Sequence, residues 1–164
     1  MKVDTVEKLF VQELKDLYSA ENQITKALPK MAKAATSPEL RTAFEAHLKE
    51  TEGQIKRLER VFEILAKTPA GKTCKGMKGL LEEGAEVMEE SPKGEVRDAA
   101  MISAAQRVEH YEIAGYGTVR SYAELLGKSE AVKLLQETLD EVGATDKKLT
   151  QISKKVNTQA QRAA

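Results

Sequence analysis

Apolar residues recur along most of this chain at alternating steps of three and four, which is the spacing of a packed face on an α-helix. Clusters that contain proline or glycine interrupt the pattern and mark the turns between helices. We expect the tail, residues 158–164, to fray. The sequence therefore predicts an all-α protein, with long helices in two pairs and a shorter helix between the pairs, over residues 3–35, 38–66, about 77–90, about 95–126 and about 129–157.

Glutamate interrupts the apolar face of each of the four long helices. On the first and the fourth helix, Glu21 and Glu112 occupy the same place in two apolar faces that can be superimposed. On the second and the fifth helix, Glu50 and Glu141 are related in the same way. The offset is 91 residues in both pairs. The chain therefore contains two helical hairpins that are built on one duplicated frame.

The duplicated frame also predicts how the hairpins pack. Each glutamate lies a similar distance from the turn of its hairpin, so the rise of an α-helix brings the two members of a pair to nearly the same height. A four-helix bundle with a long crossover connection is the arrangement of ferritin-like folds. We predict a single ferritin-like domain over residues 1–164, in which a crossover helix at about 77–90 joins hairpins at 3–66 and about 95–157.

A carboxylate that faces a packed helical core is costly unless a cation compensates its charge. Four of them at one level of a bundle therefore predict a metal site, with Glu21, Glu50, Glu112 and Glu141 as ligands. Oxygen-rich sites suit iron and manganese, and we expect two ions, with iron preferred over manganese. The alternative is a structural polar layer, satisfied by arginine or water, that sets the register of the helices.

Three further residues are candidates for this site. Glu109 lies one turn before Glu112, so the same helix can present a second carboxylate, although Glu109 can also be solvated on the flank of the bundle. His47 lies one turn before Glu50 and is the candidate imidazole ligand, while Gln54 is a weaker neutral candidate. We expect His110 to project elsewhere around its helix.

The known di-iron and di-manganese carboxylate bundles place a histidine three residues after two of their glutamates. In this chain the residues three after Glu50 and Glu141 are Gly53 and Ala144. The match to that ligand set is therefore partial, and the reaction does not follow from it.

Composition disfavours several classes of partner. Lysine plus arginine balances aspartate plus glutamate at 26 each, without a long block of either sign, so we expect no nucleic acid and no membrane as partners. The charged start of the chain lacks the apolar stretch of a signal peptide, and the single Cys74 suits a reducing compartment. We therefore expect a cytoplasmic protein.

Three strings of residues carry a further signal: Leu17-Tyr18-Ser19-Ala20-Glu21, His47-Leu48-Lys49-Glu50-Thr51 and Val108-Glu109-His110-Tyr111-Glu112-Ile113-Ala114. They resemble the YciE/YciF family of ferritin-like bacterial stress proteins. The resemblance covers nearly the whole chain and implies a cytoplasmic homodimer, similar to rubrerythrin in its core, with paired glutamates on the third bundle helix.

Two functions from different classes follow from these observations. The first is oxidase or peroxidase chemistry at a dinuclear carboxylate site, with oxygen or peroxide as the small-molecule substrate and a role in stress. The second is a non-catalytic helical stress protein that acts through dimerisation or partner binding. In the second case the glutamates form a structural layer only.

Overall fold

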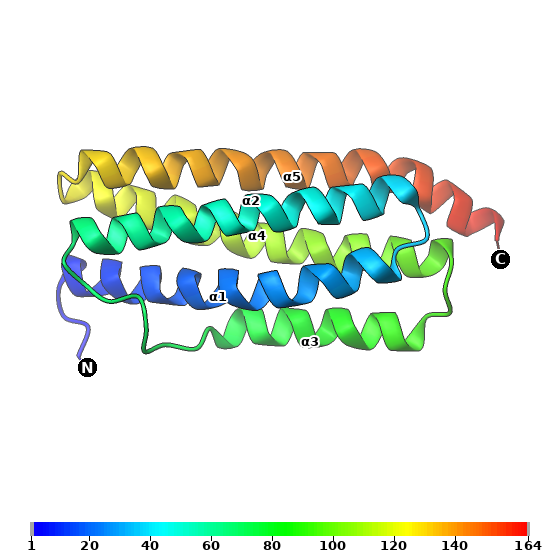
Figure 1. The fold of residues 1–164 in the computed structure, drawn as a ribbon, viewed down its shortest axis with the longest axis horizontal. Coiled ribbons are helices and arrows are strands. Elements are labelled where there is room, and N and C mark those ends of the chain that lie inside the picture. Colours follow the sequence, from blue (N-terminus) through cyan, green and yellow to red (C-terminus); the bar gives the residue numbers. More distant parts are fainter. Residues whose placement is uncertain (1, 164) are drawn as a thin grey trace.

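The computed structural model describes residues 2–163, and within this range the chain folds into helices without strands (Figure 1). Four of the helices are long and the third is short. In chain order they are α1 (Val6–Ala34), α2 (Pro38–Ile64), α3 (Lys75–Glu90), α4 (Glu95–Leu125) and α5 (Ser129–Arg162).

The four long helices lie side by side and form the bundle (Figure 1). Hairpin α1–α2 packs against hairpin α4–α5 through the contacts of α1 with α4 and of α2 with α5. Helix α3 lies on the outside, against α1 and α4, and returns the chain to the end of the bundle from which α4 starts. The prediction of an all-α, ferritin-like bundle with a crossover helix is confirmed.

Side chains at the first hairpin turn explain why α1 ends and α2 begins there. The Ser37 hydroxyl accepts a hydrogen bond from the Leu40 amide at 3.3 Å, and Pro38 occupies the tolerated first position of α2. The buried carboxylate of Asp98, on α4, accepts the Thr36 and Ser37 amides at 2.8 and 2.7 Å. Asp98 thus ties the turn of one hairpin to the start of the other.

The C-terminal helix differs from the prediction. We expected residues 158–164 to fray, but α5 continues to Arg162, and the Ala163 amide donates to the Gln159 carbonyl at 3.1 Å. The physical reason is that no glycine or proline follows residue 143, so nothing in the sequence stops the helix. Residue 164 lies outside the described residues.

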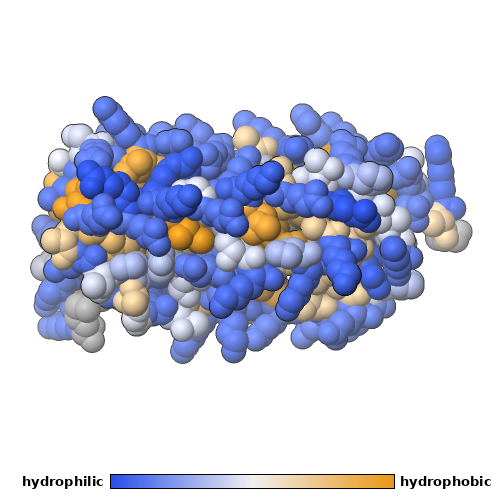
Figure 2. All heavy atoms as spheres, in the orientation of Figure 1, coloured by the Kyte–Doolittle hydropathy of each residue, from blue (hydrophilic) through white to orange (hydrophobic). Residues whose placement is uncertain are grey.

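The interior consists of two apolar clusters on either side of a polar level. One cluster contains Ile24, Leu28 and Phe44, and the other contains Phe10 and Leu58. The surface in Figure 2 is mostly hydrophilic, with small separate apolar patches. Over the described residues, none of the helices combines the length and the apolar character that a membrane crossing requires.

Candidate metal centre

Three acidic side chains and one imidazole lie in the bundle interior, between the two apolar clusters. Glu21 comes from α1, His47 from α2, and Glu109 and Glu112 from successive turns of α4. Each glutamate is at most 1% exposed, and His47 is 5% exposed. Glu21 and Glu112 lie here because each belongs to the apolar face of its helix, which packs inward. Glu109 lies one turn before Glu112 and therefore reaches the same interior.

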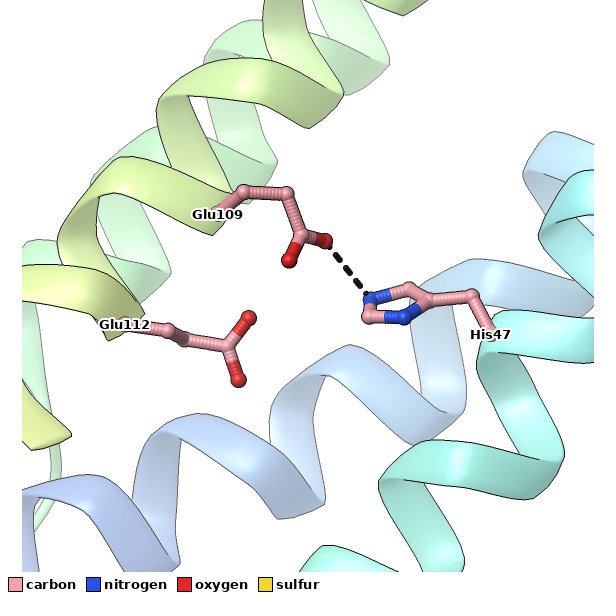
Figure 3. A group of neighbouring side chains, drawn as sticks. All are labelled: His47, Glu109 and Glu112. Atoms are coloured by element: carbon pink, nitrogen blue, oxygen red, sulfur yellow. Dashed lines mark ion pairs between the residues drawn. The ribbon is translucent and has the colours of Figure 1, made fainter. Parts of the chain in front are cut away.

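The side chains of His47, Glu109 and Glu112 point toward one another (Figure 3). His47 Nε2 lies 2.8 Å from Glu109 Oε1, and one potential ligand atom from each of the three residues lies within 4.8 Å of the other two. This spacing allows the three side chains to hold one metal ion between them. The burial of Glu109 decides against its solvation on the flank of the bundle.

Tyr116 is the neighbour that restrains Glu21. Its hydroxyl, fully buried on α4 one turn beyond Glu112, donates a hydrogen bond to Glu21 Oε1. Such a bond to a carboxylate holds one oxygen in a defined direction and leaves the other free for a ligand.

Several buried polar atoms of this group have no hydrogen-bond partner. A buried carboxylate oxygen without a partner costs a free energy of about 1–3 kcal/mol or more, so a native protein rarely keeps many together. Here the atoms lie at one level of the bundle and belong to carboxylates, one imidazole and one amide, all of which are ligand groups of divalent metal ions. The donor set therefore fits a metal ion: the unpartnered atoms are Glu21 Oε2, Glu109 Oε2, both carboxylate oxygens of Glu112, His47 Nδ1 and Gln54 Oε1.

Burial and mutual repulsion shift the proton affinities of this group. Burial raises the pKa of Glu21 to about 7, against the hydrogen bond from Tyr116. Burial, together with the charges of Glu21 and Glu109, raises the pKa of Glu112 well above its ordinary value. Burial lowers the pKa of His47, but the hydrogen bond and charge of Glu109 together with the nearby carboxylates of Glu50 and Glu21 outweigh this effect and raise the pKa to about 10. Without a cation, the group therefore retains protons at neutral pH.

Glu50 and Glu141 do not share this burial. This corrects the expectation that the four glutamates on the apolar faces of the long helices all face the core. The Glu50 side chain is 44% exposed, and its Oε2 lies 3.8 Å from His47 Nδ1, beyond hydrogen-bond distance. The Glu141 side chain is 27% exposed. The reason is that α2 and α5 are rotated so that His47 and Thr138 point inward while the glutamates lie toward the flank.

An arginine that sequence reasoning did not single out holds Glu141. Arg57 Nη2 lies 2.6 Å from Glu141 Oε1, Nη1 lies 2.9 Å from Oε2, and the Gln54 amide donates to Oε2 at 3.1 Å. A guanidinium that binds both oxygens neutralises the carboxylate. The available signal was the position of Arg57, three residues after Gln54 on the same helical face.

The other candidates take different roles. Gln54 is fully buried, and its amide group bonds Glu141 while its carbonyl oxygen is unpartnered. His110 lies on the surface, 66% exposed, with Nε2 at 3.2 Å from Asp146 Oδ2. The expectation that His110 projects away from the other candidates agrees with this position.

A second buried polar cluster, which sequence reasoning also missed, connects α1, α3 and α4. The Cys74 thiol accepts the Met77 amide at 3.3 Å as the N-cap of α3 and lies 3.1 Å from Asp16 Oδ2. The Tyr111 hydroxyl donates to the same carboxylate oxygen. A side chain at Gly76 would place its Cβ 2.8 Å from the Tyr111 ring, so a larger residue there would have to displace this ring.

Comparisons with known proteins agree with this architecture. A family model described as a domain of unknown function, DUF892, matches residues 5–162. Protein YciF of Escherichia coli (strain K12) is 50% identical, and the alignment covers all of both chains.

Three solved structures each match more than nine-tenths of this chain. The crystal structure of the E. coli stress protein YciF superimposes with a TM-score of 0.92 at 49% identity, over 96% of this chain and 99% of the other. YcfI from Rhodopseudomonas palustris gives 0.88 at 44% identity, over 91% and 95%. A protein from Xanthomonas campestris gives 0.78 at 18% identity, over 97% and 98%, and shows the fold alone. The resemblance noted in the sequence is thereby confirmed, and the chain belongs to the DUF892 family, the family of the stress protein YciF.

Proposed function

We propose that this protein binds two divalent metal ions, iron by preference and manganese as the alternative, at the level of His47, Glu109 and Glu112. The observation that carries the proposal is the set of unpartnered carboxylate oxygens between two apolar clusters. Carboxylates with a single imidazole are ligands that suit iron and manganese, and no thiolate is near to favour a softer ion.

The charges support two ions rather than one. Arg57 already compensates Glu141, which leaves the four carboxylates of Glu21, Glu50, Glu109 and Glu112. Two divalent cations carry the four positive charges that balance them when His47 is neutral. In this arrangement Glu50, beside His47, is the ligand on the solvent side. Glu141 is held by Arg57 and joins the site only if it leaves that arginine.

When bound, such ions would supply one- or two-electron oxidation with oxygen or peroxide, which suits a protein of a stress family. The residues of the chain supply the surroundings. Tyr116 orients Glu21, and the apolar clusters limit the access of water. A cavity of about 40 Å³, lined in part by Leu28, Phe44 and His47, has room for a small molecule of this kind next to the site.

The test is to purify the protein without chelator and to measure bound metal by elemental analysis. We expect one to two ions of iron or manganese per chain, and oxidation of added Fe(II) by oxygen or peroxide. Glu21→Ala and Glu112→Ala should lose the metal, whereas Glu7→Ala and Glu124→Ala, exposed glutamates on the same two helices, should retain it. Full metal content in the first two variants would refute the site.

The second candidate is a non-catalytic protein in which these residues form a structural layer. The complete pairing of Glu141 with Arg57 and Gln54 favours it, because that part of the level needs no metal. It predicts an unchanged melting temperature on addition of Fe(II) or Mn(II). A cytoplasmic homodimer is our expectation under both candidates, and sedimentation velocity would test the dimer.

A further inference from the structure

A groove of about 330 Å³ lies between α1 and the crossover helix α3. Its floor is apolar and includes Met31, Leu80, Leu81, Met88 and Val108. Helix α3 buries little of its surface against the bundle, because only Met77 of this helix is fully buried, and Gly84, which lines the groove, has no side chain to fill it. Its volume falls in the lower part of the range that small-molecule sites occupy.

The rim of the groove is basic. Lys26 and Lys30 from α1 and Lys78 from α3 line it, and Glu82 is the acidic residue among the lining side chains. Lys78 forms an ion pair with Glu82, with 3.5 Å between Lys78 Nζ and Glu82 Oε1. Lys26 and Lys30 are exposed one turn apart, and within residues 2–163 neither has a carboxylate within 4.0 Å. Two ammonium groups without partners therefore stand above an apolar floor.

We propose that this groove binds a single-chain fatty acid, with its carboxylate on Lys26 and Lys30 and its hydrocarbon chain along the floor. An apolar chain gains free energy by burial against Leu81, Met88 and Val108, while the ammonium groups compensate the charge at the other end. Neither feature alone selects the ligand class, but their adjacency in one groove selects an anionic amphiphile.

A membrane surface fits the same chemistry less well. The exposed surface of α3 carries five carboxylates, of which only Glu82 lines the groove, so an anionic bilayer over this surface would meet all five and a single chain in the groove would meet one. A concave groove also accommodates one chain better than a flat bilayer surface. These carboxylates belong to Glu82, Glu83, Glu86, Glu89 and Glu90.

The groove adjoins the candidate metal centre through a shared wall. Ala27, Met31, Leu81 and Val108 line both the groove and the cavity beside His47. The hydrocarbon chain would thus end against the residues that enclose the metal centre. Binding of the fatty acid does not depend on the metal, so the two proposals are tested separately.

The experiment is calorimetric titration of the purified full-length protein with dodecanoate, below the concentration at which dodecanoate forms micelles, and with 1-dodecanol for comparison. We expect saturation at one dodecanoate per chain and binding of the neutral alcohol at least about tenfold weaker. The double variant Lys26→Glu and Lys30→Glu should weaken dodecanoate binding by at least about tenfold. The matched control is Lys154→Glu with Lys155→Glu, which makes the same charge change on an exposed face of α5 and should bind as the original protein does.

A second variant tests the apolar floor without changing charge. Ala85 is exposed and lines the groove, so Ala85→Trp should fill it and abolish binding while circular dichroism shows the same melting temperature. Absence of saturable binding up to about 1 mM dodecanoate, or equal affinities of the two lysine double variants, would overturn the proposal. Capture by phosphatidylglycerol vesicles without dodecanoate binding, or a dimer that Ala85→Trp dissociates without dodecanoate binding, would assign the groove to a membrane or to a second copy and overturn it as well.

Discussion

The two hairpins share one frame, but equivalent positions carry different chemistry. Glu21 and Glu112 are equivalent, and both are buried. The equivalent of His47 is Thr138, which is also buried but accepts a hydrogen bond from Arg57 at 3.1 Å instead of facing a carboxylate at hydrogen-bond distance.

The flanking glutamates show the same divergence. Gln54 bonds Glu141 at 3.1 Å, and the equivalent Thr145 bonds Glu50 at 3.1 Å, so these contacts follow the duplication. Arg57 then closes one side by binding both oxygens of Glu141. Its equivalent, Lys148, stays beyond 4.0 Å from Glu50, which is half-exposed next to His47.

This difference shows how a duplicated frame becomes an asymmetric site. On one side of the polar level, the Arg57 guanidinium pairs with Glu141. On the other side, the His47 imidazole lies beside Glu50, a carboxylate that solvent can reach. A polar level can therefore be structural on one side and a candidate ligand site on the other. The fully partnered cluster of Asp16, Cys74 and Tyr111 is a second example of the structural kind.

Substitution of His47 should have the largest effect on the difference between the two hairpins. His47→Ala removes the single nitrogen ligand, and we expect metal affinity to fall by at least about 100-fold, beyond the range found for residues that only support a ligand. Thr138→Ala changes the equivalent position in the other hairpin and should leave metal affinity unchanged. Calorimetric titration with Mn(II) measures the metal affinity of both variants. Equal losses in the two variants would contradict the assigned asymmetry.

Removal of the guanidinium tests the sealed side. Arg57→Met leaves Glu141 without its cation, and we expect the free energy of unfolding to fall by about 2 kcal/mol, because the pair is only partly buried. Lys148→Met, at the equivalent position, should cost no more than about 0.5 kcal/mol. Urea unfolding of the metal-free proteins gives both values. If Glu141 then becomes a ligand, added Mn(II) will restore stability to the Arg57 variant.

The dependence of stability on pH tests the burial of the acidic group. Glu21 has its pKa raised from 4.5 to about 7 and His47 from 6.5 to about 10, so the folded metal-free protein binds more protons than the unfolded chain across this range. Its stability should therefore fall as the pH rises from about 5 to 9. Metal replaces these protons, so the metal-loaded protein should lose less stability. Melting temperatures at pH 5.5 and 8.5, with and without Mn(II), decide the point, and an opposite slope without metal would contradict it.

Loss of the tyrosine hydroxyl has the smallest expected effect. Tyr116→Phe removes the hydrogen bond to Glu21 and should lower the free energy of unfolding by about 1 kcal/mol. The control is Tyr122→Phe on the same helix, whose hydroxyl makes no hydrogen bond within the described residues, and this change should be nearly neutral. A cost of Tyr122→Phe equal to that of Tyr116→Phe would mean that the hydrogen bond contributes nothing measurable.

The sequence by itself determined the helices, their pairing and the depth of Glu21 and Glu112, because helical periodicity and the duplicated frame are local properties of the chain. Only the tertiary structure decided that Glu109 and His47 are buried, that Glu50 and Glu141 lie toward the flank, and that Arg57 crosses to Glu141. The reason is the rotation of each helix about its own axis. A position on the apolar face allows a side chain to face inward, but this rotation decides which of two neighbouring residues does so. The partners of a long side chain depend on that rotation as well, and no spacing along one helix encodes it.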